Sequence, residues 1–112
     1  MLYSIFAYDV PNSLPLRAKA RPAHIARLKE LYEGNRLIIA GPNPAIDSLE
    51  PGEAGFSGSL IVADFPSLAD AERWAELDPY VEAGVYEKVH VKPFKQVLPT
   101  PAPGKHKLAI FK

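Results

Sequence analysis

Hydrophobic and polar positions divide this chain into four strand-like segments and two helical ones. Four segments are rich in aromatic and branched residues, as β-strands are. They are Leu2–Tyr8, Arg36–Gly41, Phe56–Phe65 and Val85–Val97. Apolar residues recur at helical spacing between about Pro22 and Glu33, and Ser67 is a good N-cap for a second helix over Leu68–Leu77. The pattern predicts the element order β-α-β-β-α-β.

Proline and glycine set the expected boundaries of these elements. Ser13 could cap a short helical turn over Leu14–Ala20, but Arg21 precedes a proline and is biased away from the helical conformation. We therefore expect the main helix to begin at Pro22, where a proline suits the first turn. Residues 42–55 hold three prolines and two glycines and are predicted to form a long loop. Pro93 marks an edge position or a bulge in the last strand.

This element order is typical of an α+β, ferredoxin-like fold with a four-stranded antiparallel sheet. The alternating directions bring the end of the first strand, the start of the main helix, the end of the second strand and the end of the second helix to one edge. Residues with useful chemistry gather there. They are Asp9, Arg21, His24, Gly41, Pro42, Asn43, Asp78 and Tyr80. A site requires several segments to meet in one place, so this edge is the predicted site.

The first strand is apolar on both of its faces. Leu2, Phe6 and Tyr8 alternate with Tyr3, Ile5 and Ala7. Two helices can cover only one face of the sheet, so the other face needs a partner. We expect a homodimer in which two copies pair sheet to sheet.

Composition narrows the class of protein. The 112 residues suit one domain, and 47% are hydrophobic, which is enough for a core. Thirteen basic and thirteen acidic side chains give zero formal charge, which argues against nucleic acid as a partner. Cysteine is absent, which excludes thiol chemistry and disulfides. We also expect no membrane partner, because no apolar run is long enough to span a bilayer and the first residues lack a signal-peptide pattern. A cytoplasmic location is the expectation.

His24 and Asp78 form the candidate acid/base pair. Near a helix N-terminus the macrodipole disfavours added positive charge, so His24 is expected to be neutral and able to accept a proton. Asp78 would orient the ring and stabilise the imidazolium. The alternative is that His24 is a hydrogen-bonded structural histidine, the commoner use of a single histidine on a helix.

The sequence gives weaker support for other polar groups as site residues. Arg21 and the backbone amides near Gly41–Asn43 could hold a developing oxyanion. The rest of the basic run between Arg17 and Lys29 is expected to be a solvated helix face. A metal site from His24 and His90 is disfavoured, because Lys88 and Lys92 share a strand face with His90. No phosphate-binding glycine motif is present, and no cofactor is expected.

Several ordered segments resemble the YciI-like (YCII-related) family. They are MLYSIFAYD at 1–9, RPAHIARL at 21–28, AGPNPA at 40–45, AGFSGSLIVADF at 54–65 and AERWAELDPYVEAGVYEKVHVKPFK at 71–95. The resemblance spans residues 1–98 and implies a ferredoxin-like fold that pairs into a dimeric α+β barrel. It also implies a pocket with a histidine and an aspartate, which match His24 and Asp78. The wider superfamily includes muconolactone isomerases and small monooxygenases, and a dehydrochlorinase acting on a chlorinated hydroquinone resembles the family too.

These observations predict a small cofactor-independent enzyme of the isomerase or lyase (dehalogenase) type. The substrate would be a small oxygenated, cyclic or aromatic, organic molecule. Two alternatives stay open: a non-catalytic module that binds a small ligand, and a regulatory or oligomerisation subunit.

The last segment, residues 99–112, lies outside the resemblance. It begins as a proline-rich linker and ends as a basic tail with an apolar cluster, Leu108–Phe111. Because residues 1–98 are net acidic and the tail is basic, we expect the tail to pack against the body.

Overall fold

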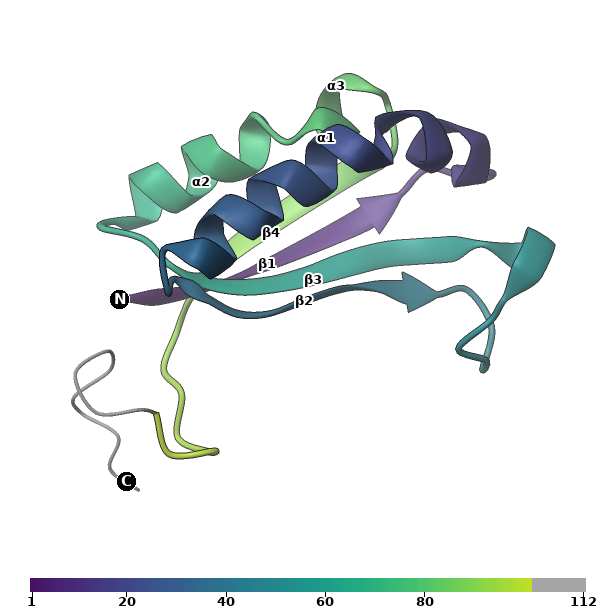
Figure 1. Ribbon diagram of the computed structural model, residues 1–112. Helices are drawn as coiled ribbons and strands as arrows, with labels where there is room; N and C mark the ends of the chain where they lie inside the picture. Colours follow the sequence, from purple (N-terminus) through teal and green to yellow (C-terminus); the bar gives the residue numbers. More distant parts are fainter. Residues whose placement is uncertain (102–112) are drawn as a thin grey trace.

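A four-stranded antiparallel sheet carries all the helices on one of its faces (Figure 1). The computed structural model describes residues 1–101. The strands are β1 (Leu2–Asp9), β2 (Leu37–Pro44), β3 (Phe56–Asp64) and β4 (Tyr86–Phe94). The helices are α1 (Leu14–Glu33), α2 (Leu68–Glu76) and α3 (Pro79–Glu82), with a short 3₁₀ turn, η1 (Gly52–Ala54). The strand order β2-β3-β1-β4 confirms the predicted ferredoxin-like fold.

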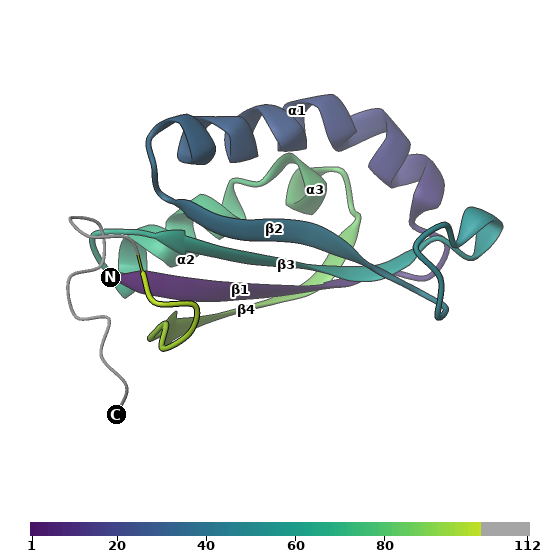
Figure 2. The ribbon, with the colours of Figure 1, turned by 60° about the horizontal axis from the view of Figure 1, so that its bottom comes forward.

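The core lies between the sheet and the helices. Tyr3 and Ile5 of β1 pair with Ala63 and Ile61 of β3, and all four side chains are buried. Helices α1 and α2 cover this layer on one side of the sheet (Figure 1), and in the turned view of Figure 2 α2 lies behind the strands. Leu31 of α1 and Ala71 and Ala75 of α2 complete the cluster. Burial of this alternating face is the main force that fixes the register of β1 on β3.

Helix α1 is continuous, and the predicted break at Arg21 is wrong. Pro22 lies inside the helix, eight residues after Leu14. Its missing N–H removes one hydrogen bond, but the residues on both sides stay helical. The buried residues of α1 explain this continuity: Arg17, His24 and Leu31 follow one another at intervals of seven, which is two helical turns. This stripe spans the proline, so packing against the sheet holds both halves in one helix.

Smaller differences concern the edges of the sheet. Strand β2 runs on to Pro44, although we expected a loop from Pro42. It is an edge strand, where a proline need not donate to a neighbour. Strand β4 forms the other edge, and Pro93 lies in it as predicted. The short helix α3 was not predicted; Asp78 is its N-cap and Pro79 its first residue.

Within residues 1–101, no helix lies on the second face of the sheet (Figure 1). We call it the open face, defined by Phe6 and Tyr8 of β1, Leu60 of β3 and Ile39 of β2. Leu2 and Val62 lie on the same face but are already buried in the single chain. In the single chain Phe6 is 37%, Tyr8 50% and Ile39 57% exposed. The predicted packing of the tail concerns Leu108–Phe111, which lie outside the described residues.

Candidate functional site

His24 and Asp78 meet on the helix side of the sheet, 54 positions apart in sequence. Asp78 Oδ1 lies 2.8 Å and Oδ2 lies 3.0 Å from His24 Nδ1. Both residues are buried, with 6% of His24 and 3% of Asp78 exposed. The contact that the element order led us to expect is therefore present. The helix-dipole argument for a neutral imidazole does not apply, because His24 lies ten residues after Leu14 and not at a helix N-terminus.

The hydrogen bonds of Asp78 define the tautomer of a neutral imidazole. A carboxylate only accepts hydrogen bonds, so Nδ1 of neutral His24 carries the proton and donates it toward Asp78. Asp78 Oδ1 also accepts the backbone N–H of Tyr80, at 2.9 Å, as the N-cap of α3. Within residues 1–101 the hydrogen bonds of the ring involve only Nδ1. The second nitrogen, Nε2, is thus left with a lone pair that can take up a proton.

Tyr80 fixes the plane of the imidazole. Its ring stacks on that of His24, with centroids 3.9 Å apart and planes 10° apart. Burial raises the pKa of Tyr80, so its hydroxyl stays protonated at neutral pH and remains a hydrogen-bond donor. The predicted residue Tyr80 is therefore part of the site, supplied by α3.

Arg17 belongs to the site, although the sequence led us to expect it on a solvated helix face. Its side chain is buried and pairs with Asp9, through Nε at 2.6 Å and Nη2 at 2.9 Å. The same Nη2 donates to Gly58 O and to Ser59 Oγ, each at 2.9 Å. Burial lowers the pKa of Arg17, but its hydrogen bonds and charge pairing with Asp9 outweigh that effect and raise it overall. The guanidinium is a permanent charge held by the end of β1.

The Tyr86 hydroxyl extends this network. It donates to Ser59 Oγ at 2.9 Å, and its ring meets Tyr80 edge to face with centroids 5.5 Å apart. Burial raises the pKa of Tyr86, which keeps the hydroxyl protonated. Ser59 could have been suspected from the sequence, since a hydroxyl at a core position of an apolar strand needs a partner. Neither Arg17 nor Tyr86 carries such a signal, because nothing local distinguishes them from exposed residues.

These groups surround a cavity of about 200 Å³. Its walls come from α1, β2, β3 and α3. The lining residues are Arg17, Arg21, His24, Ile25, Leu28, Ala40, Gly41, Pro42, Ser59, Ile61 and Tyr80. Four of the predicted residues besides His24 thus reach it: Arg21, Gly41, Pro42 and Tyr80. Asp78 stands behind His24, Asp9 stands behind Arg17, and neither Asp9 nor Asn43 lines the cavity.

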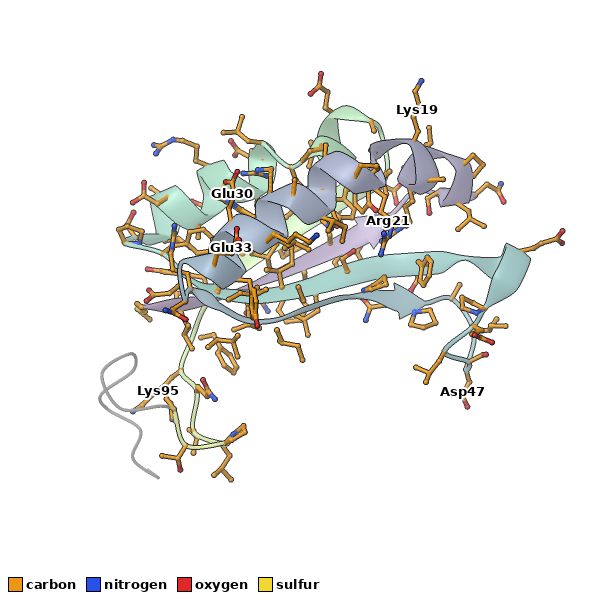
Figure 3. All side chains as sticks on the ribbon, in the orientation of Figure 1. Lys19, Arg21, Glu30, Glu33, Asp47 and Lys95 are labelled. Carbon is orange, nitrogen blue, oxygen red and sulfur yellow. The ribbon has the colours of Figure 1, made fainter. Side chains whose placement is uncertain are left out.

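The charge of the cavity comes chiefly from Arg21. Figure 3 shows this side chain pointing from α1 toward the sheet, whereas Lys19 points away from it. Among the described residues Arg21 forms no ion pair, whereas Arg17 is neutralised by Asp9 and His24 contacts Asp78. One unbalanced positive charge therefore faces the cavity and favours an anionic or strongly polarised oxygen.

The side chains that could donate to a metal ion do not support a metal site. Within residues 1–101, no three His, Cys, Asp or Glu side chains are grouped so that they could hold an ion. His90 is paired with Phe6 on the open face and stands edge-on to Tyr8, so the sheet separates it from His24. None of the helices in this part of the chain has the length and the apolar character that crossing a bilayer requires.

The chain is similar in sequence to two bacterial proteins and in fold to a solved structure. Protein YciI of Escherichia coli is 58% identical over 97 residues, covering 87% of this chain and 99% of that protein. An uncharacterized Haemophilus influenzae protein is 59% identical with the same coverage. Among solved structures, 5-chloro-2-hydroxyhydroquinone dehydrochlorinase (TftG) of Burkholderia phenoliruptrix, in complex with 2,5-dihydroxybenzoquinone, has a TM-score of 0.74 and 26% identity. The match covers 85% of this chain and 94% of that one.

The YCII-related domain matches residues 1–95, which is most of the chain and includes every residue of the site described above. The two sequence relatives are identical to this chain at more than half of the aligned positions. Together with the domain match, they confirm the resemblance to the YCII-related family that the sequence segments indicated. The chain belongs to the YCII-related family.

Proposed function

We propose that this protein is a cofactor-independent enzyme of the isomerase or lyase (dehalogenase) type, in which His24 and Asp78 move a proton on a small oxygenated ring compound. One observation carries the proposal: a buried imidazole is held by a carboxylate through Nδ1 and lines a cavity. A structural histidine would need no cavity at its side. The location is proposed to be the cytoplasm, as expected from the sequence.

The chemistry uses Nε2 as the base. It takes a proton from a hydroxyl group or an activated carbon of the substrate, and Asp78 stabilises the imidazolium that results. In an isomerisation the same nitrogen returns the proton to another substrate atom. In a dehydrohalogenation the halide leaves with the bonding electron pair, and the proton is released to solvent in the next step. Both reactions are redox-neutral.

The negative charge that develops on the substrate needs a cationic partner. As the base removes a proton, negative charge grows on a substrate oxygen, and a nearby guanidinium lowers the energy of that state. Arg21 is proposed to bind this oxygen, with Gly41, Pro42 and Tyr80 shaping the walls. Asn43 follows Pro42 on β2 and remains a predicted contact for a larger substrate. Asp9 acts through Arg17, as a positioning residue.

The comparison with TftG supports the substrate class. The name of that enzyme states that it removes HCl from a chlorinated hydroxyhydroquinone, and its bound ligand is a dihydroxylated quinone. A cavity of about 200 Å³ suits a single ring with few substituents. Hydroxylated rings also provide acidic protons for the base and oxygens for Arg21.

The proposed assembly is a homodimer through the open face. Phe6, Tyr8 and Ile39 expose apolar area on a sheet face that no helix of residues 1–101 covers. A second copy of the same face would remove that area from water. The cavity lies on the other side of the sheet, so pairing leaves it accessible.

The test is an assay of the full chain with 5-chloro-2-hydroxyhydroquinone, with chloride release as the readout. Compounds without chlorine are incubated in D₂O, and exchange of carbon-bound hydrogen is followed by mass spectrometry. His24→Ala should abolish both signals. Lys19→Ala is the matched control, since Lys19 is on the same helix but points away from the sheet, and it should keep them.

Binding of such rings without any turnover or exchange would contradict the enzyme and favour the non-catalytic binding module. A titration with 2,5-dihydroxybenzoquinone followed by calorimetry separates these outcomes. If the ring binds, and His24→Ala changes neither binding nor exchange, the proposed role of His24 is wrong.

A further inference from the structure

A second hollow, of about 330 Å³, lies beside the C-terminal half of α1 and along α2. Its walls combine three arginines with two aromatic rings. The lining residues are Arg27, Arg36, Phe65, Pro66, Asp70, Arg73, Trp74 and Leu77. None of them lines the cavity at His24. The two helices that flank the hollow run side by side over the sheet (Figure 1). We call it the arginine hollow.

Two of its guanidinium groups lie over aromatic rings. The Arg27 Cζ is 4.3 Å from the centroid of the Trp74 ring, and the Arg36 Cζ is 5.1 Å from that of Phe65. The two rings touch, with centroids 5.7 Å apart. Stacking of this kind uses the flat face of a guanidinium and leaves the N–H groups at its edge for hydrogen bonds. The rings thus hold two arginines at the hollow with donors to spare.

Most of these donors have no acceptor among residues 1–101. Arg27 Nη2 donates to the Trp74 carbonyl at 2.9 Å, and Arg36 Nε donates to the Asp64 carbonyl at 3.0 Å. Arg27 Nη1 is buried and has no hydrogen-bond partner in this part of the chain. A charged donor that is removed from water without an acceptor is unfavourable. Burial also lowers the pKa of Arg27, although the charges of Asp78 and Glu30 oppose that effect.

The charge of the arginine hollow is positive. Asp70 is the one carboxylate among its lining residues in the described part of the chain. This carboxylate is already engaged: Oδ1 accepts from Arg73 at 3.1 Å, and Oδ2 accepts from the Ser67 hydroxyl at 2.9 Å. Among the lining residues, three arginines against one aspartate leave an excess of two positive charges, while Asp78 and Glu30 act on Arg27 from outside this set. The formal net charge of the whole protein is zero, so this positive excess is local to the hollow.

We propose that the arginine hollow binds a doubly charged oxyanion of the phosphate class, either free phosphate or a phosphate monoester. Guanidinium edges match the oxygens of such a group and bind them in pairs. After a small rotation of its side chain, Arg27 would donate Nη1 to a phosphate oxygen and so gain the acceptor that it lacks. The volume exceeds what a bare phosphate needs and leaves room for a small organic group. This site is independent of the function proposed above.

The sequence itself supplies a probe, because Trp74 is its single tryptophan. Inorganic phosphate and phenyl phosphate are titrated separately into the full chain at constant ionic strength, with sodium chloride as the balance, while Trp74 emission is recorded. We expect a saturable change in emission with phosphate and none with chloride. Calorimetry then measures affinity in the variants, since Arg27→Gln itself alters the surroundings of Trp74. Arg27→Gln and Arg36→Gln should each weaken binding by about tenfold or more, as the loss of a charge-assisted hydrogen bond does.

Two variants serve as controls. Lys29→Gln removes a charge from an exposed position of the same helix and should leave phosphate affinity unchanged. Arg21→Gln removes the charge of the other cavity and should also leave it unchanged. If Arg27→Gln does not fold, Arg36→Gln decides. Tighter binding of phenyl phosphate would favour a monoester as the ligand, and equal affinity would favour free phosphate.

Two results would overturn the proposal. In the first, Trp74 responds to chloride and to phosphate alike, which means that salt merely screens the arginines. In the second, phosphate binds with equal affinity to the parent chain and to both arginine variants, which means that it binds elsewhere. Loss of binding in Arg21→Gln alone would assign the phosphate to the cavity at His24 and would likewise exclude the arginine hollow.

Discussion

Asp78 serves two donors at once, the imidazole of His24 and the backbone N–H of Tyr80. Its two roles can be separated by substitution. Asn is also a good N-cap, so Asp78→Asn should keep α3 and most of the stability. It should still lower turnover by about 10²–10⁴-fold, because an amide neither fixes the tautomer nor stabilises an imidazolium.

Asp78→Ala should lose turnover and should also lower the free energy of unfolding by about 1–3 kcal/mol. Steady-state kinetics and urea unfolding check both; equal turnover in Asp78→Asn and the parent would contradict the role.

The ion pair between Asp9 and Arg17 is a residue-scale feature of a different kind. Its side chains are only 1% and 7% exposed, so removal of one partner leaves a buried charge without compensation. We expect Asp9→Asn to lower the free energy of unfolding by about 3–5 kcal/mol. The exposed pair of Arg73 and Asp70 is the comparison, and Arg73→Gln should cost less than about 1 kcal/mol. Urea denaturation of both variants provides the test, and similar losses would show that Arg17 is not effectively buried.

At the scale of the element, α1 is held together by what it packs against. Pro22 breaks its hydrogen-bond ladder, yet the stripe of Arg17, His24 and Leu31 continues across it. Pro22→Ala should restore one donor and stabilise the protein by about 1–3 kcal/mol. Pro15 is the matched control, because it lies in the first turn, where a proline costs little, and Pro15→Ala should change stability far less. Thermal unfolding measures the difference. A loss of stability in Pro22→Ala would mean that the packing requires the local geometry of proline.

At the scale of the whole molecule, the open face makes the predicted dimer testable. Tyr8 is 50% exposed on this face, and a charge there should oppose close pairing of two sheets. We expect the parent chain to sediment at twice its mass of 12.3 kDa and Tyr8→Asp to shift toward the monomer. An obligate interface of this type buries about 2,000 Å² or more and is largely apolar, so one charge buried in it should weaken it strongly.

The control for the dimer is an exposed aromatic residue on the helix side. Tyr32 of α1 is 70% exposed, and Tyr32→Asp should leave the sedimentation profile unchanged. A parent chain that sediments as a monomer at micromolar concentration would exclude the dimer. A dimer that survives in Tyr8→Asp but not in Tyr32→Asp would place the interface on the helices instead.

The sequence by itself determined the order of the four strands and the two main helices, and the faces of the sheet. Both depend on local rules: the alternation of apolar side chains in β1 and β3, and the helical spacing of Leu28 and Leu31. Once the order β-α-β-β-α-β was known, topology alone brought His24 and Asp78 to one side of the sheet. Only the tertiary structure decided which arginines are buried. Arg17 and Arg21 look alike in the sequence, and the difference between them is Asp9, which meets Arg17 only after β1 and α1 pack together. The continuity of α1 across Pro22 was decided in the same way, because long-range packing outweighs the local preference of a proline.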